Sequence, residues 1–349
     1  MALEVDVEKT YGAFRLEASF RTEGEPLALL GPSGCGKSLT LKCIAGIQRP
    51  DRGRIVLDGQ VLFDSAAHID LPPQRRRVGY LFQQYALFPH MTVAENIAAG
   101  CRGLGREERK KRTAELAAML RLEGLEGLRP RQLSGGQQQR TALARILASE
   151  PRAILLDEPF SALDSHLKWQ LEPELKDVLD GFAGAAVWVT HDLEEAYRNC
   201  PRVCVMEAGR TGPVRDMAAL PSDPRTVEAA RLTGCRNCAA AEPEAGTGRL
   251  RVPQWGASLR AAAPWRREAR AVGIREECLR PAAEEDENVL DCAVARRVED
   301  VSAWVLLLRP RGGVPDAPLL RMKVEKGAAL PEGDTLRVVL PPEDILILE

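Results

Sequence analysis

A glycine-rich segment near the start of the chain has the composition and spacing of a phosphate-binding loop. Residues 31–38, GPSGCGKS, follow the apolar run 27–30 and precede the helical pattern of residues 37–47. Glycines let backbone N–H groups turn inward around phosphate oxygens, and the N-terminus of the next helix adds partial positive charge there. In this context Lys37 is expected to reach the β- and γ-phosphates, and the Ser38 hydroxyl to ligate Mg²⁺. The segment therefore predicts a nucleoside triphosphate site.

Two carboxylates follow a second apolar run, at residues 153–156. A strand there would deliver Asp157 and Glu158 to the carboxyl edge of a sheet, where ligands bind in open α/β folds. Asp157 fits a role in organising Mg²⁺, and Glu158 fits the general base that orients or deprotonates the attacking water. An acidic turn is the alternative interpretation of this pair. The presence of a phosphate loop in the same domain favours the catalytic interpretation of the two carboxylates.

A second pair of glycines lies in residues 133–137, LSGGQ, just before the helical stretch 138–148. Paired glycines that open a helix form a second anion-binding helix N-terminus. One ATP does not need two such sites in one subunit. We therefore expect each ATP to lie between the loop of one chain and this segment of another chain. The alternative is a glycine pair that only caps the helix.

Apolar patterns around these segments predict a layered α/β domain. Residues 3–7 alternate as a half-buried strand does, and residues 27–30, 153–156 and 185–190 are compact apolar runs suited to central parallel strands. Residues 92–149 have a helical pattern. Strands that alternate with helices indicate an α/β layered domain.

The pattern changes after about residue 225. Short segments rich in β-formers are separated there by Pro, Gly and Arg; they include GRLRV, RAVGI, NVLDCAV, SAWVLLLRP, PLLRMKV and LRVVL. Closely spaced short strands of this kind predict a small β-barrel.

The composition is ordinary for a globular protein and excludes several classes. The 349 residues, 45% hydrophobic and 28% charged, correspond to about two domains at roughly 150 residues each. With 48 Lys and Arg against 50 Asp and Glu, the chain lacks the basic excess of a nucleic-acid-binding protein. No apolar run reaches the roughly 20 residues that span a bilayer. Glu4, Asp6 and Glu8 occupy positions where an export signal would be basic or apolar, so we expect no export.

The nine cysteines have no framework spacing, and we expect reduced thiols. Cys235 and Cys238 form a single CxxC. A zinc site would need a second ligand pair, and no CxxC or His pair follows in the sequence. A metal or redox role for this pair is therefore the less favoured interpretation.

Taken together, these motifs resemble those of the ATP-binding subunits of ABC transporters. In this resemblance residues 31–38 match the Walker A motif, 133–137 the signature motif, 154–158 the Walker B motif and 161–164 the D-loop. The order and spacing of the motifs are specific to the family. The resemblance covers residues 1 to about 220 strongly.

Single residues match the family as well. Gln83 matches the Q-loop glutamine, His191 the switch histidine, and Tyr11 the aromatic that stacks on adenine. The resemblance implies that Glu158, His191 and Gln83 are catalytic and that Ser38, Gln83 and Asp157 serve Mg²⁺. The nucleotide contacts that it implies are Tyr11, Gly31, Pro32, Ser33, Gly34, Cys35, Gly36, Lys37, Ser38, Leu39, Ser134, Gly135, Gly136, Gln137 and Asp164.

Pro173 is one departure from a regular pattern. It falls inside the helical segment 165–180, SHLKWQLEPELKDVLD. A proline in the middle of a helix removes a hydrogen bond, so we expect a kink or a restart of the helix there.

The family implies two domains. Residues 1–230 would form an α/β P-loop NTPase with an ABC-type core and a helical subdomain at about 87–149. Residues 231–349 would form a small all-β, barrel-like domain of the TOBE type, related to oligonucleotide/oligosaccharide-binding barrels, with a regulatory or dimerisation role. The segments GIREECLRP and PPEDILIL resemble recurring parts of that domain.

The resemblance implies an ATPase that energises a binding-protein-dependent importer with ATP and Mg²⁺. Its partners would be a second copy of the chain, two transmembrane permease subunits and, indirectly, a periplasmic or extracellular solute-binding protein, with no nucleic acid. Its place would be the cytoplasmic face of the cell membrane, as a peripheral subunit.

The solute is expected from two further segments. ARLTGCRNCA and SALDSHLKWQLE resemble the sulfate/molybdate/tungstate subgroup, and molybdate or tungstate is the expected solute. Sulfate, iron or a polyamine are the alternatives. A non-transport ABC ATPase is the less favoured class.

Overall fold

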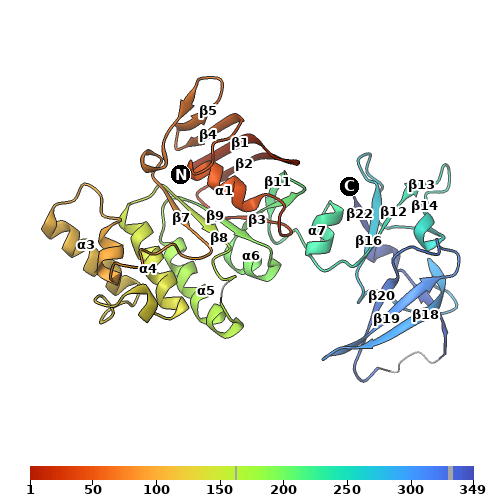
Figure 1. Cartoon of the computed structure of the whole chain (residues 1–349). Helices are drawn as coiled ribbons and strands as arrows, with labels where there is room; N and C mark the ends of the chain where they lie inside the picture. The colour runs from red at the N-terminus through yellow and green to blue at the C-terminus, as the bar shows by residue number, and fades with distance from the viewer. Residues whose placement is uncertain (162, 329–332) are drawn as a thin grey trace. The chain divides into compact units, whose positions relative to one another are not determined.

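The computed structural model describes residues 1–161, 163–328 and 333–349 of the chain. Two compact units are present, Met1–Ala218 and Ala219–Glu349 (Figure 1). The division lies before the boundary at residue 230 expected from the sequence. Helix α7 explains the difference, because it packs with strands of the second unit around buried Ala230.

The first unit is built on an eleven-stranded sheet with the order β6-β5-β4-β1-β2-β11-β10-β3-β9-β8-β7. Neighbours from β10 to β7 run parallel, and those from β6 to β2 run antiparallel. The strands are β1 (Ala2–Tyr11), β2 (Phe14–Glu23), β3 (Leu27–Leu30), β4 (Arg52–Leu57), β5 (Gln60–Asp64), β6 (Ile69–Asp70), β7 (Val78–Leu81), β8 (Ala153–Asp157), β9 (Ala185–Thr190), β10 (Arg202–Glu207) and β11 (Arg210–Asp216).

The central strands are the continuous apolar runs expected from the sequence. Every residue of β3, β8 and β9 is buried, as both faces of a parallel sheet require. β8 and β9 are in register with Asp157 opposite Val189, and β3 and β9 with Leu30 opposite Thr190. The loops that follow these strands therefore leave the same edge of the sheet.

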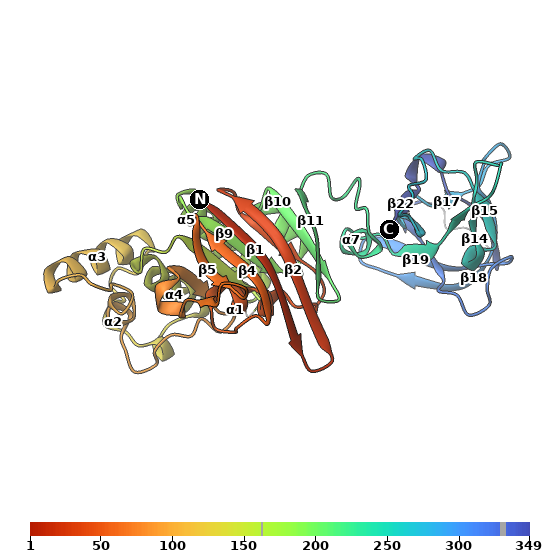
Figure 2. The ribbon, with the colours of Figure 1, turned by 90° about the horizontal axis from the view of Figure 1, so that it is seen from above.

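Helices flank this sheet and form a separate group at one side of it. In both views α3 lies beyond α4, away from the β1–β2 hairpin, and Figure 2 shows α2 on the same side (Figures 1 and 2). The stretch predicted to be helical at 92–149 contains three α-helices joined by turns. The helices are α1 (Lys37–Ala45), η1 (Pro73–Arg75), α2 (Val93–Ala98), α3 (Arg106–Met119), η2 (Pro130–Gln132), α4 (Gly135–Ala148), α5 (Ser165–Asp180) and α6 (Leu193–Asn199).

Helix α5 does not restart at Pro173. It is continuous over its 16 residues with the proline inside, so the expected restart is wrong. Proline removes only the bond to the carbonyl four residues earlier, and the buried side chains of Leu171, Leu175 and Leu179 hold the helix on both sides of it. No helix in the described part of the chain is long and apolar enough to cross a membrane.

The second unit is mainly β, as expected for the barrel-like domain. Its five-stranded sheet, β17-β21-β18-β19-β20, forms a nearly closed barrel beside two three-stranded sheets, β12-β16-β22 and β13-β14-β15. The elements are α7 (Val227–Leu232), β12 (Asn237–Ala240), β13 (Glu242–Pro243), β14 (Leu250–Val252), η3 (Pro253–Trp255), β15 (Ala257–Leu259), β16 (Ala271–Ile274), β17 (Arg280–Pro281), β18 (Val289–Glu299), β19 (Ala303–Pro310), β20 (Leu320–Glu325), β21 (Thr335–Val339), η4 (Pro342–Asp344) and β22 (Leu346–Leu348).

The buried Arg76 binds the C-terminal end of α1, the helix that follows the predicted phosphate loop. Arg76 has no exposed surface. Its guanidinium donates to the carbonyls of Cys43 and Ile44 in the last turn of α1 at 2.8 and 2.9 Å. It also donates to the carbonyl of Leu71 and to Asp70 at 2.7 and 2.9 Å. Arg76 therefore satisfies carbonyls at the end of the helix that the protein has removed from water.

We predict that Arg76→Met lowers the free energy of unfolding by about 3 kcal/mol, because it leaves buried carbonyls without donors. Arg75→Met changes an exposed neighbour and is the matched control, with an expected effect of about 0.5 kcal/mol or less. Urea-induced unfolding followed by circular dichroism measures both. Equal midpoints for the two variants would contradict this role of Arg76.

Candidate nucleotide-binding and hydrolysis site

The predicted phosphate loop joins β3 to α1 at the edge where the parallel strands end. Gly34 and Gly36 have φ angles of 80° and 111°, in the left-handed region that favours glycine. A Cβ at Gly31 would lie 2.2 Å from the carbonyl oxygen of Met206 on β10. Glycine at these positions therefore allows the tight path of the loop against β10.

Lys37 begins α1, and its ammonium group lies within this loop. Nζ donates to the carbonyl oxygens of Gly31 and Pro32 at 2.7 and 2.8 Å, and the residue is only 4% exposed. Burial raises the pKa of the neighbouring Cys35 thiol, so Cys35 stays neutral beside the lysine. The first turn of α1 contains no acidic residue. Helix N-terminus and ammonium together form a positive site for phosphate.

Asp157 accepts two short hydrogen bonds at the end of β8. Ser38 Oγ on α1 donates to Oδ1 at 2.6 Å, and Tyr80 Oη on β7 donates to Oδ2 at 2.7 Å. Burial and the adjacent carboxylate raise the pKa of Tyr80, so its phenol remains a donor. The serine and the carboxylate are hard oxygen ligands of the kind that Mg²⁺ prefers. Sequence reasoning missed Tyr80, because nothing local marks a tyrosine that bonds to a residue on the next strand.

Glu158 and His191 face each other at the ends of β8 and β9. The distance from His191 Nδ1 to Glu158 Oε1 is 3.4 Å, and the glutamate side chain is 20% exposed. The backbone of Glu158 has φ 47°, a left-handed conformation that is strained by about 1–3 kcal/mol in a residue other than glycine. Its N–H donates to the carbonyl of Val189 at 3.0 Å. The strained turn thus places a partly exposed carboxylate beside an imidazole.

A charged cluster supports the segment that carries His191. Lys168 Nζ on α5 lies 2.5 Å from Asp192 Oδ2 and 2.8 Å from Glu195 Oε2. Glu195 is 4% exposed and also accepts from Trp188 Nε1 at 2.7 Å. Burial lowers the pKa of Lys168, but the hydrogen bonds to both carboxylates raise it overall. The lysine therefore links the helix after the D-loop to the turn of His191, a contact that the sequence did not reveal.

The signature segment forms a capped helix N-terminus. Ser134 is the N-cap of α4, and its Oγ accepts from Gln137 N at 3.3 Å while Gln137 Oε1 accepts from Ser134 N at 2.9 Å. Gly136 packs against Leu171, where a Cβ would lie 2.8 Å from a methyl carbon. Gly135 follows Ser134 on the partly exposed side. Among the described residues, no recorded hydrogen bond joins this segment to the phosphate loop of the same chain.

Other predicted residues lie around this edge of the first unit. Tyr11 ends β1 and is 68% exposed. Gln83 follows β7 and is exposed, and no hydrogen bond recorded for the described residues joins it to Ser38 or Asp157. Asp164 is the N-cap of α5 and accepts from Leu167 N at 2.8 Å. Ala162, which belongs to the predicted D-loop, lies outside the described residues.

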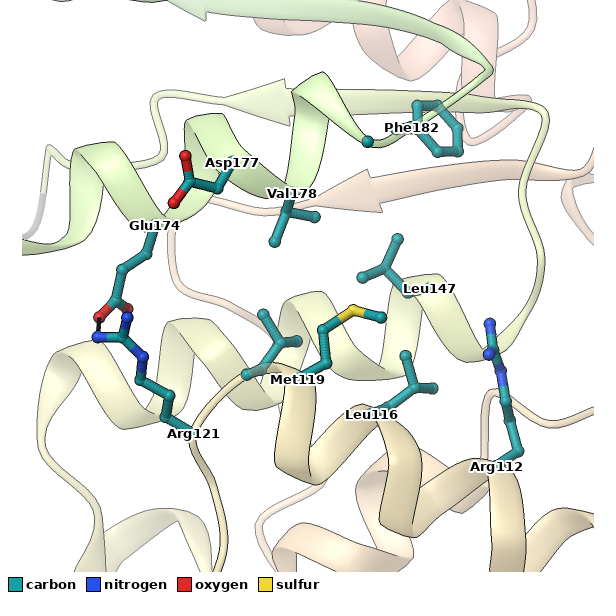
Figure 3. A pocket seen from close by; sticks show the side chains of 11 residues that line it. Arg112, Leu116, Met119, Arg121, Leu147, Glu174, Asp177, Val178 and Phe182 are labelled. Atoms are coloured by element: carbon teal, nitrogen blue, oxygen red, sulfur yellow. Dashed lines mark hydrogen bonds and ion pairs between the residues drawn. The ribbon is translucent and has the colours of Figure 1, made fainter.

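A pocket of about 410 Å³ lies away from this site, among α3, α4 and α5 (Figure 3). Its lining combines apolar side chains with charged ones, and Arg121 and Glu174 form an ion pair of 2.8 Å there. The lining residues are Arg112, Leu116, Met119, Leu120, Arg121, Leu147, Glu174, Asp177, Val178, Gly181 and Phe182. None of the predicted nucleotide contacts is among them, so this pocket is not the nucleotide site.

Comparison with known proteins identifies the class to which this fold and site belong. A family model described as ABC transporter matches residues 18–161. Among solved structures, the chain is similar to a dimeric structure of the ATP-binding cassette MJ0796 in a post-hydrolysis state bound to ADP and Pi. The sequences are 33% identical, the TM-score is 0.52, and the match covers 62% of this chain and 99% of that one. The chain is an ABC transporter ATPase.

Relatives from importers extend this assignment over nearly the whole chain. The spermidine/putrescine import ATP-binding protein PotA of Rubrobacter xylanophilus is 39% identical, with coverage of 93% of this chain and 87% of that protein. PotA of Methylococcus capsulatus is 48% identical over 62% of this chain and 57% of its own length. The sulfate/thiosulfate import ATP-binding protein CysA of Gloeobacter violaceus is 42% identical, over 70% of this chain and 71% of its own. The chain belongs to the family of ABC importer ATP-binding proteins.

We predict that Tyr80→Phe lowers the ATPase kcat by about tenfold, because Asp157 loses a charge-assisted hydrogen bond worth about 1.5–3 kcal/mol. The Mg²⁺ concentration for half-maximal rate should rise as well. Tyr197→Phe, which changes a tyrosine that is 52% exposed on α6, is the matched control. Steady-state phosphate release as a function of MgCl₂ measures both effects. Unchanged kcat and unchanged Mg²⁺ dependence in Tyr80→Phe would show that the bond is dispensable.

Proposed function

We propose that the chain hydrolyses ATP at this site to energise solute import, with Glu158 as the base. The observation that carries the proposal is the convergence of Lys37, Asp157 and Glu158 at one edge of the sheet. The phosphate loop and Lys37 would bind the β- and γ-phosphates. Glu158 would orient the water and take its proton, while His191, 3.4 Å away, would contact the γ-phosphate.

Mg²⁺ fits the oxygen ligands of Ser38 and Asp157. Ser38 Oγ and Asp157 Oδ1 lie 2.6 Å apart and belong to the hydroxyl and carboxylate types typical of magnesium sites. When bound, the ion would neutralise charge on the phosphate oxygens. Tyr80 would hold the second carboxylate oxygen of Asp157 in place. Gln83 is proposed as a further contact to this ion.

We further propose that two copies of the chain enclose two ATP molecules. The capped N-terminus of α4 would supply Ser134 and Gly136 from one chain to the γ-phosphate held by the loop of the other. Tyr11, exposed at the end of β1, would stack on adenine, and Asp164 would lie near the same interface. The dimeric cassette structure with ADP and Pi supports this arrangement. Permease subunits, and through them a solute-binding protein, are the proposed partners at the inner face of the membrane.

We predict that Glu158→Gln binds ATP but hydrolyses it at least about 100-fold more slowly, since an amide cannot accept the proton. Glu123→Gln, at an exposed position outside the site, is the control and should keep the wild-type rate. Equilibrium binding of ATP and single-turnover phosphate release separate the two steps. A rate near that of the wild type in Glu158→Gln would remove Glu158 from the role of base.

The solute is proposed to be a polyamine, with sulfate as the second candidate. Support for a polyamine comes from PotA of Rubrobacter xylanophilus, because that alignment covers 93% of this chain, including its second unit. CysA relatives favour sulfate over a shorter alignment, 70% of the chain in Gloeobacter violaceus. The molybdate or tungstate expected from the sequence has no support from these relatives. That expectation rested only on the resemblance of ARLTGCRNCA and SALDSHLKWQLE to one subgroup. The alternatives given with it, a polyamine or sulfate, are better supported by the relatives.

Uptake measurements test this proposal directly. In a strain that lacks the chain, we expect loss of putrescine and spermidine uptake, restored by wild-type protein and not by Glu158→Gln. Radiolabelled sulfate and cellular molybdenum are followed in parallel. Loss of sulfate uptake alone would select the second candidate, and a fall in molybdenum alone would return to the first expectation. No change in any solute would contradict the role in import.

A further inference from the structure

Two thiols of the second unit lie in contact. Cys235 follows α7 and Cys238 lies on β12, with their sulfur atoms 3.7 Å apart. Of the nine cysteines in the chain, these are the two that the described structure records within hydrogen-bonding distance of each other. Within the described residues no group of three or more His, Cys, Asp or Glu is placed to hold a metal ion. The pair therefore lacks the ligands of a zinc site.

A glycine on the neighbouring strand provides the space for both sulfur atoms. Gly273 on β16 is opposite Cys238 in the antiparallel pairing. A Cβ at Gly273 would lie 3.0 Å from the sulfur of Cys235 and 3.4 Å from that of Cys238. The two thiols thus occupy a place that a side chain would otherwise fill. A disulfide requires the sulfur atoms to approach from 3.7 Å to about 2.05 Å.

The two thiols differ in access and in acidity. Cys235 is 0% exposed, whereas Cys238 is partly exposed. The hydrogen bond from Cys235 and the nearby charge of Arg231 lower the pKa of Cys238. The hydrogen bond to Cys238 and burial raise the pKa of Cys235. The accessible thiol is therefore the one that more easily becomes a thiolate.

We propose that Cys235 and Cys238 form a thiol–disulfide exchange site that takes small disulfides of the glutathione type. The thiolate of Cys238 attacks one sulfur of the disulfide, forms a mixed disulfide and releases one glutathione thiolate, which takes up the proton lost by Cys238. The sulfur of Cys235 then attacks the Cys238 sulfur and releases the second glutathione as its thiol. Overall two protein thiols are oxidised to one disulfide, and one oxidised glutathione is reduced to two thiols.

Hydrogen bonds of Asn237 and Arg275 hold the segment around the two cysteines. Asn237 exchanges two hydrogen bonds with the backbone of Arg321, at 2.8 and 2.7 Å. Arg275 donates to the carbonyls of Thr233 and Pro221 on the other side. The loop closed by a bridge is very short, so its chain-entropy effect on unfolding is small. The expected consequence is local: the bridge would fix the segment after α7 to β12.

Thiol counting in glutathione buffers tests the proposal. The full chain is equilibrated at a series of ratios of reduced to oxidised glutathione, quenched with acid, alkylated under denaturing conditions so that buried thiols also react, and analysed by intact mass and peptide mapping. We expect a population that has lost two of its nine alkylatable thiols without retained glutathione, with the bridge mapped to Cys235 and Cys238. Excess dithiothreitol should restore both thiols.

Single variants separate the two steps. Cys235→Ser should retain glutathione on Cys238, because the buried attacking thiol is missing, and Cys238→Ser should show neither adduct nor bridge. Cys278→Ser, which changes a thiol of similar partial exposure, is the matched control and should form the bridge as the wild type does. Circular dichroism verifies that each variant is folded.

Two results would overturn the proposal. One is nine alkylatable thiols in the wild type at every ratio. The other is a bridge or an adduct that maps to other cysteines while Cys235 and Cys238 stay reduced. Both readings come from the wild-type chain, so a variant that fails to fold does not affect them.

Discussion

Parallel pairing of β3, β9, β8 and β7 is the constraint on which the site depends. In a parallel sheet the carboxyl ends of all strands lie at the same edge. Strand pairing alone therefore brings together loops that are distant in sequence. Ser38 follows β3 through the phosphate loop, Asp157 is the last residue of β8, and His191 directly follows β9. Tyr80 lies near the end of β7. Burial of the apolar strands therefore drives the same arrangement that concentrates charge at the edge. Folding energy and chemistry come from the same pairing.

Much of this arrangement could be predicted because its signals are local. The glycine-rich loop lies between an apolar run and a helical pattern, and the carboxylate pair follows another apolar run. In both cases the neighbouring residues are enough to predict the strand or helix that positions the motif. Lys37, Asp157 and Glu158 were identified in this way. The β-strands of the second unit could also be predicted from local signals, since short strands there are separated by turn-forming residues. The continuous helix at Pro173 was not, because its stability depends on leucines that pack against other elements.

The remaining features depend on tertiary contacts that no single segment encodes. Tyr80 and Lys168 are ordinary strand and helix residues until the fold places them 2.7 Å and 2.5 Å from Asp157 and Asp192. Gln137 and Asp164 match nucleotide-binding motifs, yet in the chain their side chains cap helices. The solute is a separate case, because the motifs of this chain predict an ATP site and contain no residues assigned to a solute.

The reciprocal hydrogen bonds between Ser134 and Gln137 have a thermodynamic consequence. Because the two residues already hold each other at the start of α4, the conformational entropy of this segment is lost when the chain folds and not when a ligand arrives. An anion that binds there meets N–H groups in a fixed arrangement. The free energy of that step then carries little entropic cost from ordering of the backbone.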